Sequence, residues 1–173
     1  PGSRPSTERL REALFSIWQS EVAGSRFLDL FCGSGVVGLE ALSRGAESVV
    51  LADASRRSLA TARDNVRRLE LGAAVTIVAG RLPGLVGRLV AAGPFDLVFA
   101  DPPYGFEGLA KLLAALPPLL TGHGRAAVEH AADESPEIPT ELELVDRRVY
   151  GQSALTLLRL QGSVRSRNEV SSR

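Results

Sequence analysis

Residues 27–38 are FLDLFCGSGVVG, an apolar run that passes directly into three closely spaced glycines. The run Phe27–Phe31 predicts a short buried strand, and a helix is expected to begin near Val36. Between them, the G-x-G-x-x-G pattern of residues 33–38 allows a tight turn and a close approach of the backbone to a ligand. The N-terminus of the helix would then offer unpaired N–H groups to an anion. This pattern indicates a nucleotide-type loop without identifying the ligand.

Outward from this loop, short apolar runs alternate with segments of helical periodicity. Further strands are expected at 48–52, 75–78, 95–100 and 124–129, with a closing antiparallel pair at 142–150 and 154–160. Helices are expected at 6–20, 36–43, 55–71, 82–92 and 108–116. The inner strands are continuous apolar runs, which is typical of parallel strands with helices on both faces. The sequence therefore predicts an α/β, Rossmann-like domain with a mostly parallel seven-stranded sheet and an antiparallel closing strand.

The size and composition of the chain restrict its class. Its 173 residues suit one domain, expected at 4–161, and a polar tail at 162–173 is expected to be disordered or vector-derived. Twenty basic and twenty acidic residues give no net charge, which argues against a long footprint on naked nucleic acid. No apolar run reaches the ~20 residues that cross a bilayer, and Cys32, the single cysteine, allows no internal disulfide. We therefore expect a cytoplasmic monomer without a membrane anchor.

Two acidic residues accompany the glycine loop. Asp53 follows Gly33 by twenty residues, at the end of the next strand, where a carboxylate accepts hydrogen bonds from ribose hydroxyls. Asp29 lies inside the apolar strand, where it would face the positive amino-acid end of S-adenosylmethionine; NAD carries no such ammonium or sulfonium group. The pair therefore favours S-adenosylmethionine as the cofactor. Two simpler interpretations stay open: loop amides could satisfy Asp29, and Asp53 could cap the helix that begins near Ser55.

The second informative segment is Asp101-Pro102-Pro103-Tyr104, which follows the apolar strand expected at 95–100. In this fold the carboxyl end of such a strand opens beside the cofactor crevice. The two prolines fix the backbone and lack N–H groups, so the exposed groups are acceptors, the Asp101 carboxylate and the Pro102 carbonyl. Acceptors suit an amino group, and Tyr104 can stack on a flat base. These four residues are the predicted catalytic residues; the alternative is a rigid turn that only ends the strand.

The predicted chemistry is methylation of an exocyclic amino group of a nucleic-acid base. Such an amine is a poor nucleophile because its lone pair is delocalised into the ring. Hydrogen bonds to Asp101 and Pro102 would favour a pyramidal nitrogen and stabilise the positive charge that develops on it. Positioning for in-line attack would do much of the remaining work. No metal is required, and His123 and His130 are isolated from any cysteine pair.

Three segments carry a resemblance to a known family: RPSTERLREALF at 4–15, DLFCGSG at 29–35 and DPPY at 101–104. Together they resemble the RsmD-type methyltransferases, which place an N2-methyl on a guanine of 16S ribosomal RNA. The resemblance extends to about Leu160, and Tyr150-Gly151 supports it. It implies the fold of class I S-adenosylmethionine-dependent methyltransferases. It also implies that residues 4, 5 and 7 lie near the cofactor and the target.

The chain departs from the RsmD-type pattern in two ways. Such proteins usually begin with a basic β-hairpin before the Arg-Pro-Thr/Ser segment; it is absent from this sequence, so weaker RNA binding is expected. After the strand at 75–78 an Asp or Asn often recognises the cofactor's adenine, whereas Gly80 and Arg81 stand here and their backbone groups are expected to serve instead. The predicted cofactor-binding residues are Thr7, Asp29, Phe31, Gly33, Ser34, Gly35, Asp53, Ala54, Gly80 and Arg81. The predicted substrate-binding residues are Arg4, Arg9, Arg11 and Tyr104, with the arginines available to phosphates.

The expected substrate is 16S ribosomal RNA within a small-subunit ribosomal particle. A chain of this size has no room for a target-recognition domain, so its substrate must present the base as an unstacked loop nucleotide, or the base must be extruded. The alternatives are a DNA adenine-N6 or a protein glutamine-N5 methyltransferase, since both can use a Pro-Pro-aromatic turn. More distant alternatives are an NAD-dependent oxidoreductase and a non-catalytic, cofactor-binding RNA chaperone.

Overall fold

The computed structural model describes residues 5–162, with side chains from Glu8 onward. The helices are α1 (Pro5–Ile17), α2 (Val36–Ser43), α3 (Arg56–Arg68), α4 (Val86–Ala92) and α5 (Leu109–Ala115), with a 3-10 helix at Pro117–Leu119. The strands are β1 (Arg26–Leu30), β2 (Ser48–Asp53), β3 (Val75–Ala79), β4 (Phe95–Ala100), β5 (Leu120–Ala131), β6 (Leu142–Tyr150) and β7 (Ser153–Leu160). Within these described residues, no helix combines the length and the apolar character needed to span a bilayer.

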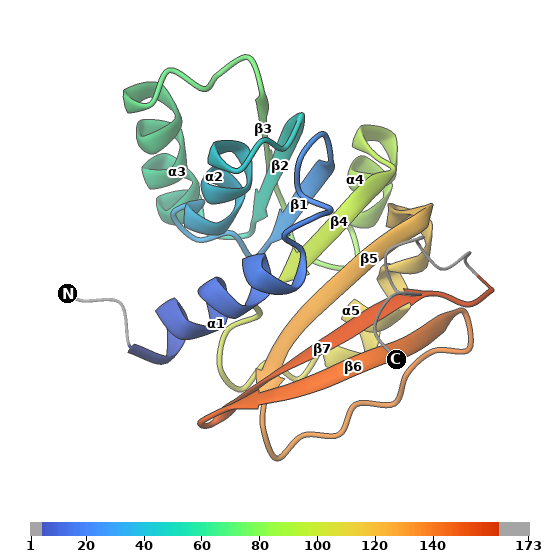
Figure 1. Cartoon of the computed structure of the whole chain (residues 1–173). Coiled ribbons are helices and arrows are strands. Elements are labelled where there is room, and N and C mark those ends of the chain that lie inside the picture. The colour runs from blue at the N-terminus through green and yellow to red at the C-terminus, as the bar shows by residue number, and fades with distance from the viewer. Residues whose placement is uncertain (1–4, 163–173) are drawn as a thin grey trace.

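The strands form a seven-stranded sheet in the order β3-β2-β1-β4-β5-β7-β6 (Figure 1). Strands β1 to β5 pair in parallel, and β7 runs antiparallel to both β5 and β6, which confirms the predicted Rossmann-like α/β fold. The order of the strands reverses between β1 and β4, and ligands of such sheets bind outside the carboxyl ends of the strands at the reversal. Leu30 and Ala100, the last residues of these two strands, are paired neighbours. The glycine loop and the Asp101 turn therefore start side by side.

Helices cover both faces of the sheet, α1, α2 and α3 on one face and α4 and α5 on the other (Figure 1). Successive residues of an inner strand point to opposite faces, so Phe27 packs with the first group of helices and Leu28 with the second. The ring of Phe27 stacks against that of Phe15 at 6.4 Å and meets the indole of Trp18 edge-on at 6.1 Å. The continuous apolar runs in the sequence thus reflect burial of the strands on both faces.

Two glycines are required here, Gly35 in the turn between β1 and α2 and Gly38 inside α2. Gly35 has a φ of 82°, and a Cβ there would lie 2.9 Å from Cδ1 of Leu51. At Gly38 a Cβ would lie 2.4 Å from Cδ2 of the same leucine, so α2 packs directly on β2 through a surface without a side chain. The side chain of Asn65 on α3 holds the loop from outside, with Nδ2 donating to the Ser34 carbonyl at 3.0 Å.

Four helices are shorter than predicted: α1 ends at Ile17 rather than at residue 20, α5 loses one residue at each end, and α3 and α4 are also shortened. The helix α3 ends at Arg68, three residues before the predicted end, because Glu70 takes a left-handed conformation with a φ of 57°. The helix α4 begins at Val86, four residues after the predicted start, because Pro83 and Gly84 lie in a turn that precedes it. In both places the local backbone preference of a few residues overrides the apolar periodicity.

The strand β5 is longer than predicted and begins at Leu120 rather than Gly124. Its pairing with β4 is irregular at that end, since Phe95 is opposite Leu120 while Leu97 is opposite Arg125. The polar residues at 121–123 lie in this irregular section, which explains why the apolar pattern does not extend through it.

Candidate functional site

Two open cavities meet at the carboxyl ends of β1, β4 and β5. The Asp53 cavity, of about 530 Å³, is lined by Leu30, Phe31, Ala52, Asp53, Ala54, Ser55, Ser58, Gly80, Arg81, Leu82, Leu85, Asp101, Pro103 and Phe106. The Glu129 cavity, of about 910 Å³, is lined by Asp101, Pro102, Pro103, Tyr104, Gly105, Phe106, Leu109, Glu129, His130, Ala131, Asp133, Glu134, Gln152 and Ser153. Asp101, Pro103 and Phe106 line both cavities, so a ligand in either one can reach the turn after β4.

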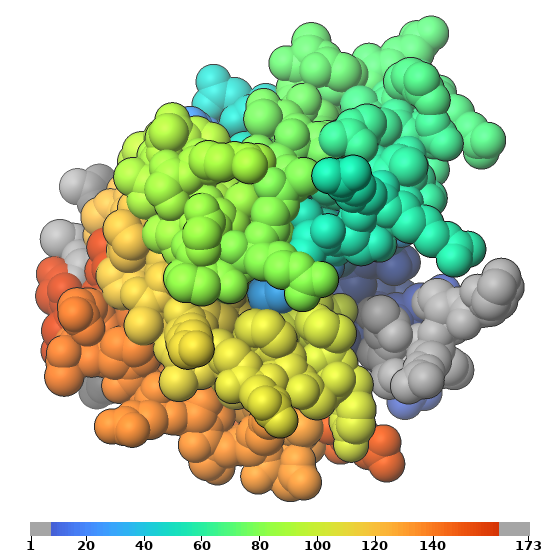
Figure 2. Space-filling view, turned by 180° about the vertical axis from the view of Figure 1, so that it is seen from behind, coloured from blue at the N-terminus to red at the C-terminus, as the bar shows by residue number. Residues whose placement is uncertain are grey.

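The Asp53 cavity is formed by segments that are far apart in the sequence. Figure 2 shows a recess between the teal segment that follows β2, the green segment that follows β3 and the yellow segment that follows β4. The blue end of β1 is visible at the bottom of this recess. Four parallel strands thus contribute their carboxyl ends to one site, as the sheet topology requires.

The carboxylate of Asp53 connects the glycine loop to the start of α3. Its Oδ2 accepts the N–H of Gly33 at 2.9 Å, and its Oδ1 accepts the N–H of Ser55 at 2.7 Å. The cap of α3 is Ser55, whose Oγ accepts the N–H of Ser58 at 3.1 Å, so the cap interpretation of Asp53 is wrong. Each carboxylate oxygen can accept a second hydrogen bond, and the residue lines the cavity. Asp53 therefore offers acceptors to a ligand with hydroxyl groups.

Asp29 lies beneath the glycine loop rather than on the cavity surface. It is 1% exposed, and its Oδ2 accepts the N–H of Gly38 at 2.9 Å. Burial raises the pKa of its carboxyl from 3.8 to about 7; the bond from Gly38 opposes this, and the negative charges of Asp101 and Asp53 add to it. The loop amide is the partner that the simpler interpretation expected. A cationic ligand above the loop would favour the charged form of this residue.

The glycine loop itself is set back from the cavity. Gly33, Ser34 and Gly35 do not line it, although Gly33 is bonded to Asp53, which does. Among the other predicted cofactor residues, Phe31, Ala54, Gly80 and Arg81 do line the cavity. The structure thus brings half of the predicted cofactor residues onto one surface, while Asp29 and the loop residues 33–35 do not line it.

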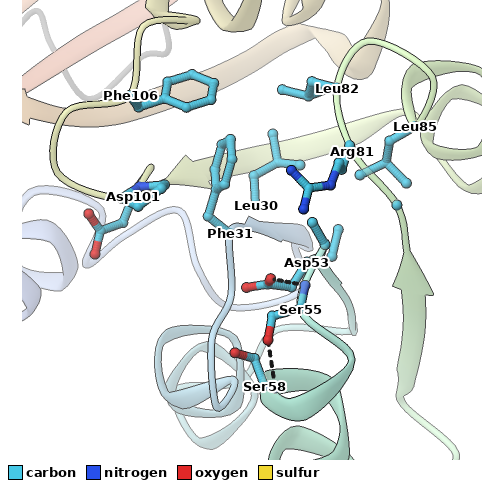
Figure 3. A pocket seen from close by; sticks show the side chains of 14 residues that line it. Leu30, Phe31, Asp53, Ser55, Ser58, Arg81, Leu82, Leu85, Asp101 and Phe106 are labelled. Carbon is cyan, nitrogen blue, oxygen red and sulfur yellow. Dashed lines mark hydrogen bonds between the residues drawn. The ribbon is translucent and has the colours of Figure 1, made fainter.

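Two aromatic rings line the Asp53 cavity, and one of them, Phe106, lines the Glu129 cavity as well. Phe31 has a positive φ of 60°, and its ring meets that of Phe106 edge-on at 5.2 Å. Figure 3 shows the two rings between Asp101 on one side and the Leu82–Leu85 segment on the other. Phe106, Leu82 and Leu85 were not predicted from the sequence. With Phe31 they form an apolar slot that suits a flat ring.

Asp101 and Glu129 form a pair of neighbouring carboxyl groups. Ala100 on β4 is opposite Val128 on β5, so the next residue of each strand lies at the same level, and their side chains are hydrogen-bonded. The pKa of Asp101 is raised from 3.8 to about 7, first by burial and then by the charge of Glu129 and this hydrogen bond. Glu129 was missed in the sequence, although it directly follows the apolar run 126–128.

The rest of the predicted catalytic turn faces outward. Pro102 is half-buried, Pro103 is exposed, and the side chain of Tyr104 is 99% exposed at the edge of the Glu129 cavity. A large aromatic side chain that is almost fully exposed has both ring faces free for stacking. The turn therefore combines acceptor groups with a free aromatic surface.

Two of the predicted substrate-binding arginines, Arg9 and Arg11, line neither cavity. Arg4 and the side chain of Thr7 lie outside the described residues. Arg9 is exposed on α1, and Arg11 forms an ion pair from its Nε to Oε2 of Glu40 at 2.7 Å. Contact of these residues with phosphates stays a prediction. In the described part of the chain, no three His, Cys, Asp or Glu residues are grouped to hold a metal ion.

Comparison with known proteins gives consistent results. The model of a family described as conserved hypothetical protein 95 matches residues 1–159. Ribosomal RNA small subunit methyltransferase D of Escherichia coli (strain K12) is 31% identical over 160 residues, 91% of this chain and 79% of that protein. A solved structure of a hypothetical protein from Thermus thermophilus is 37% identical, with a TM-score of 0.75 over 91% of this chain and 89% of that one. The rRNA methyltransferase aviRa from Streptomyces viridochromogenes, 20% identical, shares the fold, with a TM-score of 0.66 over 91% of this chain and 85% of that one.

Proposed function

Since this chain belongs to the conserved hypothetical protein 95 family, the family of the RsmD-type methyltransferases, we propose that it methylates N2 of a guanine in 16S ribosomal RNA with S-adenosylmethionine. The substrate in this proposal is a small-subunit ribosomal particle in the cytoplasm, and the enzyme acts as a monomer. The observation that carries the proposal is the position of Asp101 and Pro103, which line both cavities. A methyl donor in one cavity and an acceptor base in the other would meet at this turn.

The Asp53 cavity fits the cofactor. Asp53 offers carboxylate acceptors to ribose hydroxyls, and the slot formed by Phe31, Leu82 and Leu85 suits the adenine ring. S-adenosylmethionine would supply an electrophilic methyl group on a positively charged sulfur. The buried carboxyl of Asp29 beneath the loop would match that charge, while loop N–H groups would face the carboxylate of the amino-acid end.

The Glu129 cavity is the proposed place of the target base. Tyr104 would stack on the base, because its ring is exposed at the edge of this cavity. The Asp101 carboxylate and the Pro102 carbonyl would accept the two N–H groups of the exocyclic amine, which orients the lone pair of the nitrogen toward the Asp53 cavity. The same acceptors would stabilise the positive charge that develops on that nitrogen.

The amino groups of adenine in DNA and of a glutamine side chain would also suit these acceptors. Ribosomal RNA is favoured over both because of the family and because the E. coli relative is named for the small-subunit rRNA. An NAD-dependent oxidoreductase would leave the Asp101–Tyr104 turn without a role. A non-catalytic RNA chaperone would not need Asp101 to line both cavities, and it would not need the hydrogen-bond acceptors of that residue.

The test is transfer of labelled methyl from S-adenosylmethionine to small ribosomal subunits from cells that lack the enzyme, with free rRNA, DNA and protein alongside. We expect labelled N2-methylguanine in the rRNA, and a loss of at least about 100-fold in rate for Asp101→Ala. The control is Asp64→Ala, because Asp64 is exposed on α3 and lines neither cavity.

Other results would identify the alternatives. Label in the DNA or protein fraction would indicate the adenine or glutamine enzymes. Full labelling by Asp101→Ala would remove the proposed role of the turn, and a chain that binds no S-adenosylmethionine would overturn the methyltransferase assignment.

A further inference from the structure

The Glu129 cavity contains a second carboxyl group whose role the transfer of a methyl group does not explain. Glu129 follows Val128 on β5, and its side chain is hydrogen-bonded to that of Asp101. Both residues line the cavity, together with Pro102 and Tyr104. Two oxygen-bearing side chains thus stand next to each other, beside the ring that would stack on the base.

The other carboxyl and imidazole groups that line this cavity have partners of their own or are exposed to solvent. His130, the neighbour of Glu129, has its Nε2 2.7 Å from Oγ1 of Thr156 and its Nδ1 2.9 Å from the Ala131 carbonyl. Glu134 is exposed and accepts the N–H of Ala131 at 3.3 Å, and Asp133 is exposed on the same loop. Asp29, whose pKa the charge of Asp101 helps to raise, does not line this cavity. Glu129 is therefore the carboxyl that lies beside the predicted position of the reacting amine.

The purine bases differ at the atom next to their amino group. Guanine has N1–H beside its 2-amino group, so two neighbouring donors face outward. Adenine has an unprotonated N1 beside its 6-amino group, so a donor stands next to an acceptor. A carboxylate at the second position would bind N1–H of guanine and would repel the lone pair of the adenine N1.

We infer that Glu129 is a specificity-determining residue that accepts N1–H of the target guanine while Asp101 and Pro102 hold its 2-amino group. This inference rests on the proposed function and adds to it the residue that selects the base. On binding, the guanine N–H groups take the place of the hydrogen bond between the two carboxyl groups. The register of β4 and β5 places the two side chains next to each other in this cavity, as the neighbouring N–H groups of the guanine edge require.

The test compares wild type with Glu129→Gln and Glu129→Ala in methyl transfer to small ribosomal subunits from cells that lack the enzyme. Measurements at about pH 8.5 are decisive, because Asp101, with a pKa raised to about 7, has then lost its proton. We expect kcat/KM for guanine labelling to fall at least about tenfold in Glu129→Gln, since a charged acceptor is replaced by a neutral one. A larger fall is expected in Glu129→Ala.

Glu137→Gln is the matched control, because it makes the same change of side chain at an exposed position that lines neither cavity. Its kcat/KM is expected to stay within about twofold of wild type, as for most exposed substitutions. S-adenosylmethionine affinity and the urea midpoint of each variant check that the fold and the Asp53 cavity are intact, and the near-isosteric Glu129→Gln keeps the test valid if Glu129→Ala unfolds.

The outcomes separate this inference from the proposed function. Wild-type kcat/KM in Glu129→Gln at about pH 8.5, whether or not its acidic limb moves to lower pH, would overturn the inference alone, since it would mean that Glu129 at most adjusts the ionisation of Asp101. A wild-type chain that labels no RNA, or labels a base other than guanine, would overturn the proposed function and this inference with it.

Discussion

The carboxylate of Asp53 accepts the N–H of Gly33 at 2.9 Å, so the end of β2 fixes the position of the glycine loop that follows β1. A second bond, from the N–H of Ser55 at 2.7 Å, ties the same carboxylate to the start of α3. The carboxylate of Asp53 therefore holds two segments at the carboxyl edge of the sheet, the glycine loop and the start of α3. Its replacement should affect ligand binding more than folding, because the residue is only half-buried.

We predict that Asp53→Asn weakens S-adenosylmethionine binding at least about tenfold, since one carboxylate oxygen becomes an N–H donor that faces a backbone N–H or a ribose hydroxyl. Isothermal titration calorimetry measures the change. The control is Asp64→Asn on the outer side of α3, which should leave the affinity unchanged. Equal affinities of Asp53→Asn and wild type would contradict a contact between Asp53 and the cofactor.

The rate of methyl transfer should rise with pH through about 7 and then level off. The pKa of Asp101 is raised to about 7 by burial and by Glu129, and the charged carboxylate is the stronger acceptor for an amine. A pH profile of kcat/KM checks this. In Glu129→Gln the charge of the neighbour is gone, so the remaining activity should show its acidic limb at lower pH. An unmoved limb would mean that another group controls the profile.

The stability of the fold should change with pH in the opposite direction. Folded Asp101 and Asp29 keep their protons up to about pH 7, whereas the unfolded chain loses them near 3.8. The folded state binds more protons within this window, so the free energy of unfolding should fall as pH rises from about 4 to 7 and level off above it. Urea unfolding at several pH values measures the slope, which Asp101→Asn should reduce.

Gly38→Ala should destabilise the protein by about 1–3 kcal/mol, because its Cβ would lie 2.4 Å from Leu51 Cδ2 and 2.8 Å from Val49 Cγ1. Gly87→Ala is the matched control: Gly87 lies inside α4 with no atom within 4 Å of an added Cβ. There the better helix propensity of alanine should stabilise the fold by about 0.5–1 kcal/mol. Urea denaturation measures the change in the free energy of unfolding of both variants. A Gly38→Ala variant as stable as wild type would refute the close packing of α2 on β2.

Tyr104→Ala should lower kcat/KM for small ribosomal subunits, while the affinity for S-adenosylmethionine stays the same. The ring is 99% exposed and lines only the Glu129 cavity, so its removal takes away a stacking surface of about 1–3 kcal/mol without disturbing the core. Tyr104→Phe keeps the ring and should retain most of the activity. If the phenylalanine variant were as poor as the alanine variant, the hydroxyl rather than the stacking would matter.

The strands and the glycine loop could be predicted because each depends on residues close together in the chain. The apolar run 95–100 predicts a buried strand without reference to any other segment, and Gly35 predicts a tight turn because glycine readily adopts a positive φ. The exact ends of α3, α4 and β5 were less predictable. They depend on a left-handed Glu70, on the turn at Pro83 and on an irregular pairing with β4, and the last of these requires a partner strand.

The parts of the site that were missed are those set by contacts between distant segments. Glu129 gains its place from the register of β5 against β4, and Phe106 gains its place from the ring of Phe31. Neither contact can be inferred from the spacing of residues along the sequence. Arg11 shows the converse case, since it was expected to be available to phosphates and is paired with Glu40 on the next helix.

The position of β1 beside β4 also affects how the enzyme is made. The N–H of Arg26 donates to the carboxylate of Asp96 across a separation of seventy residues. One edge of β1 therefore stays unpaired until β4 has been synthesised. Pairings of such long range slow folding, and an open strand edge can pair with other chains meanwhile. The cofactor loop emerges early during translation, whereas Asp101 and Glu129 come later. A ribosome therefore has to finish most of this chain before the chain can modify ribosomal RNA.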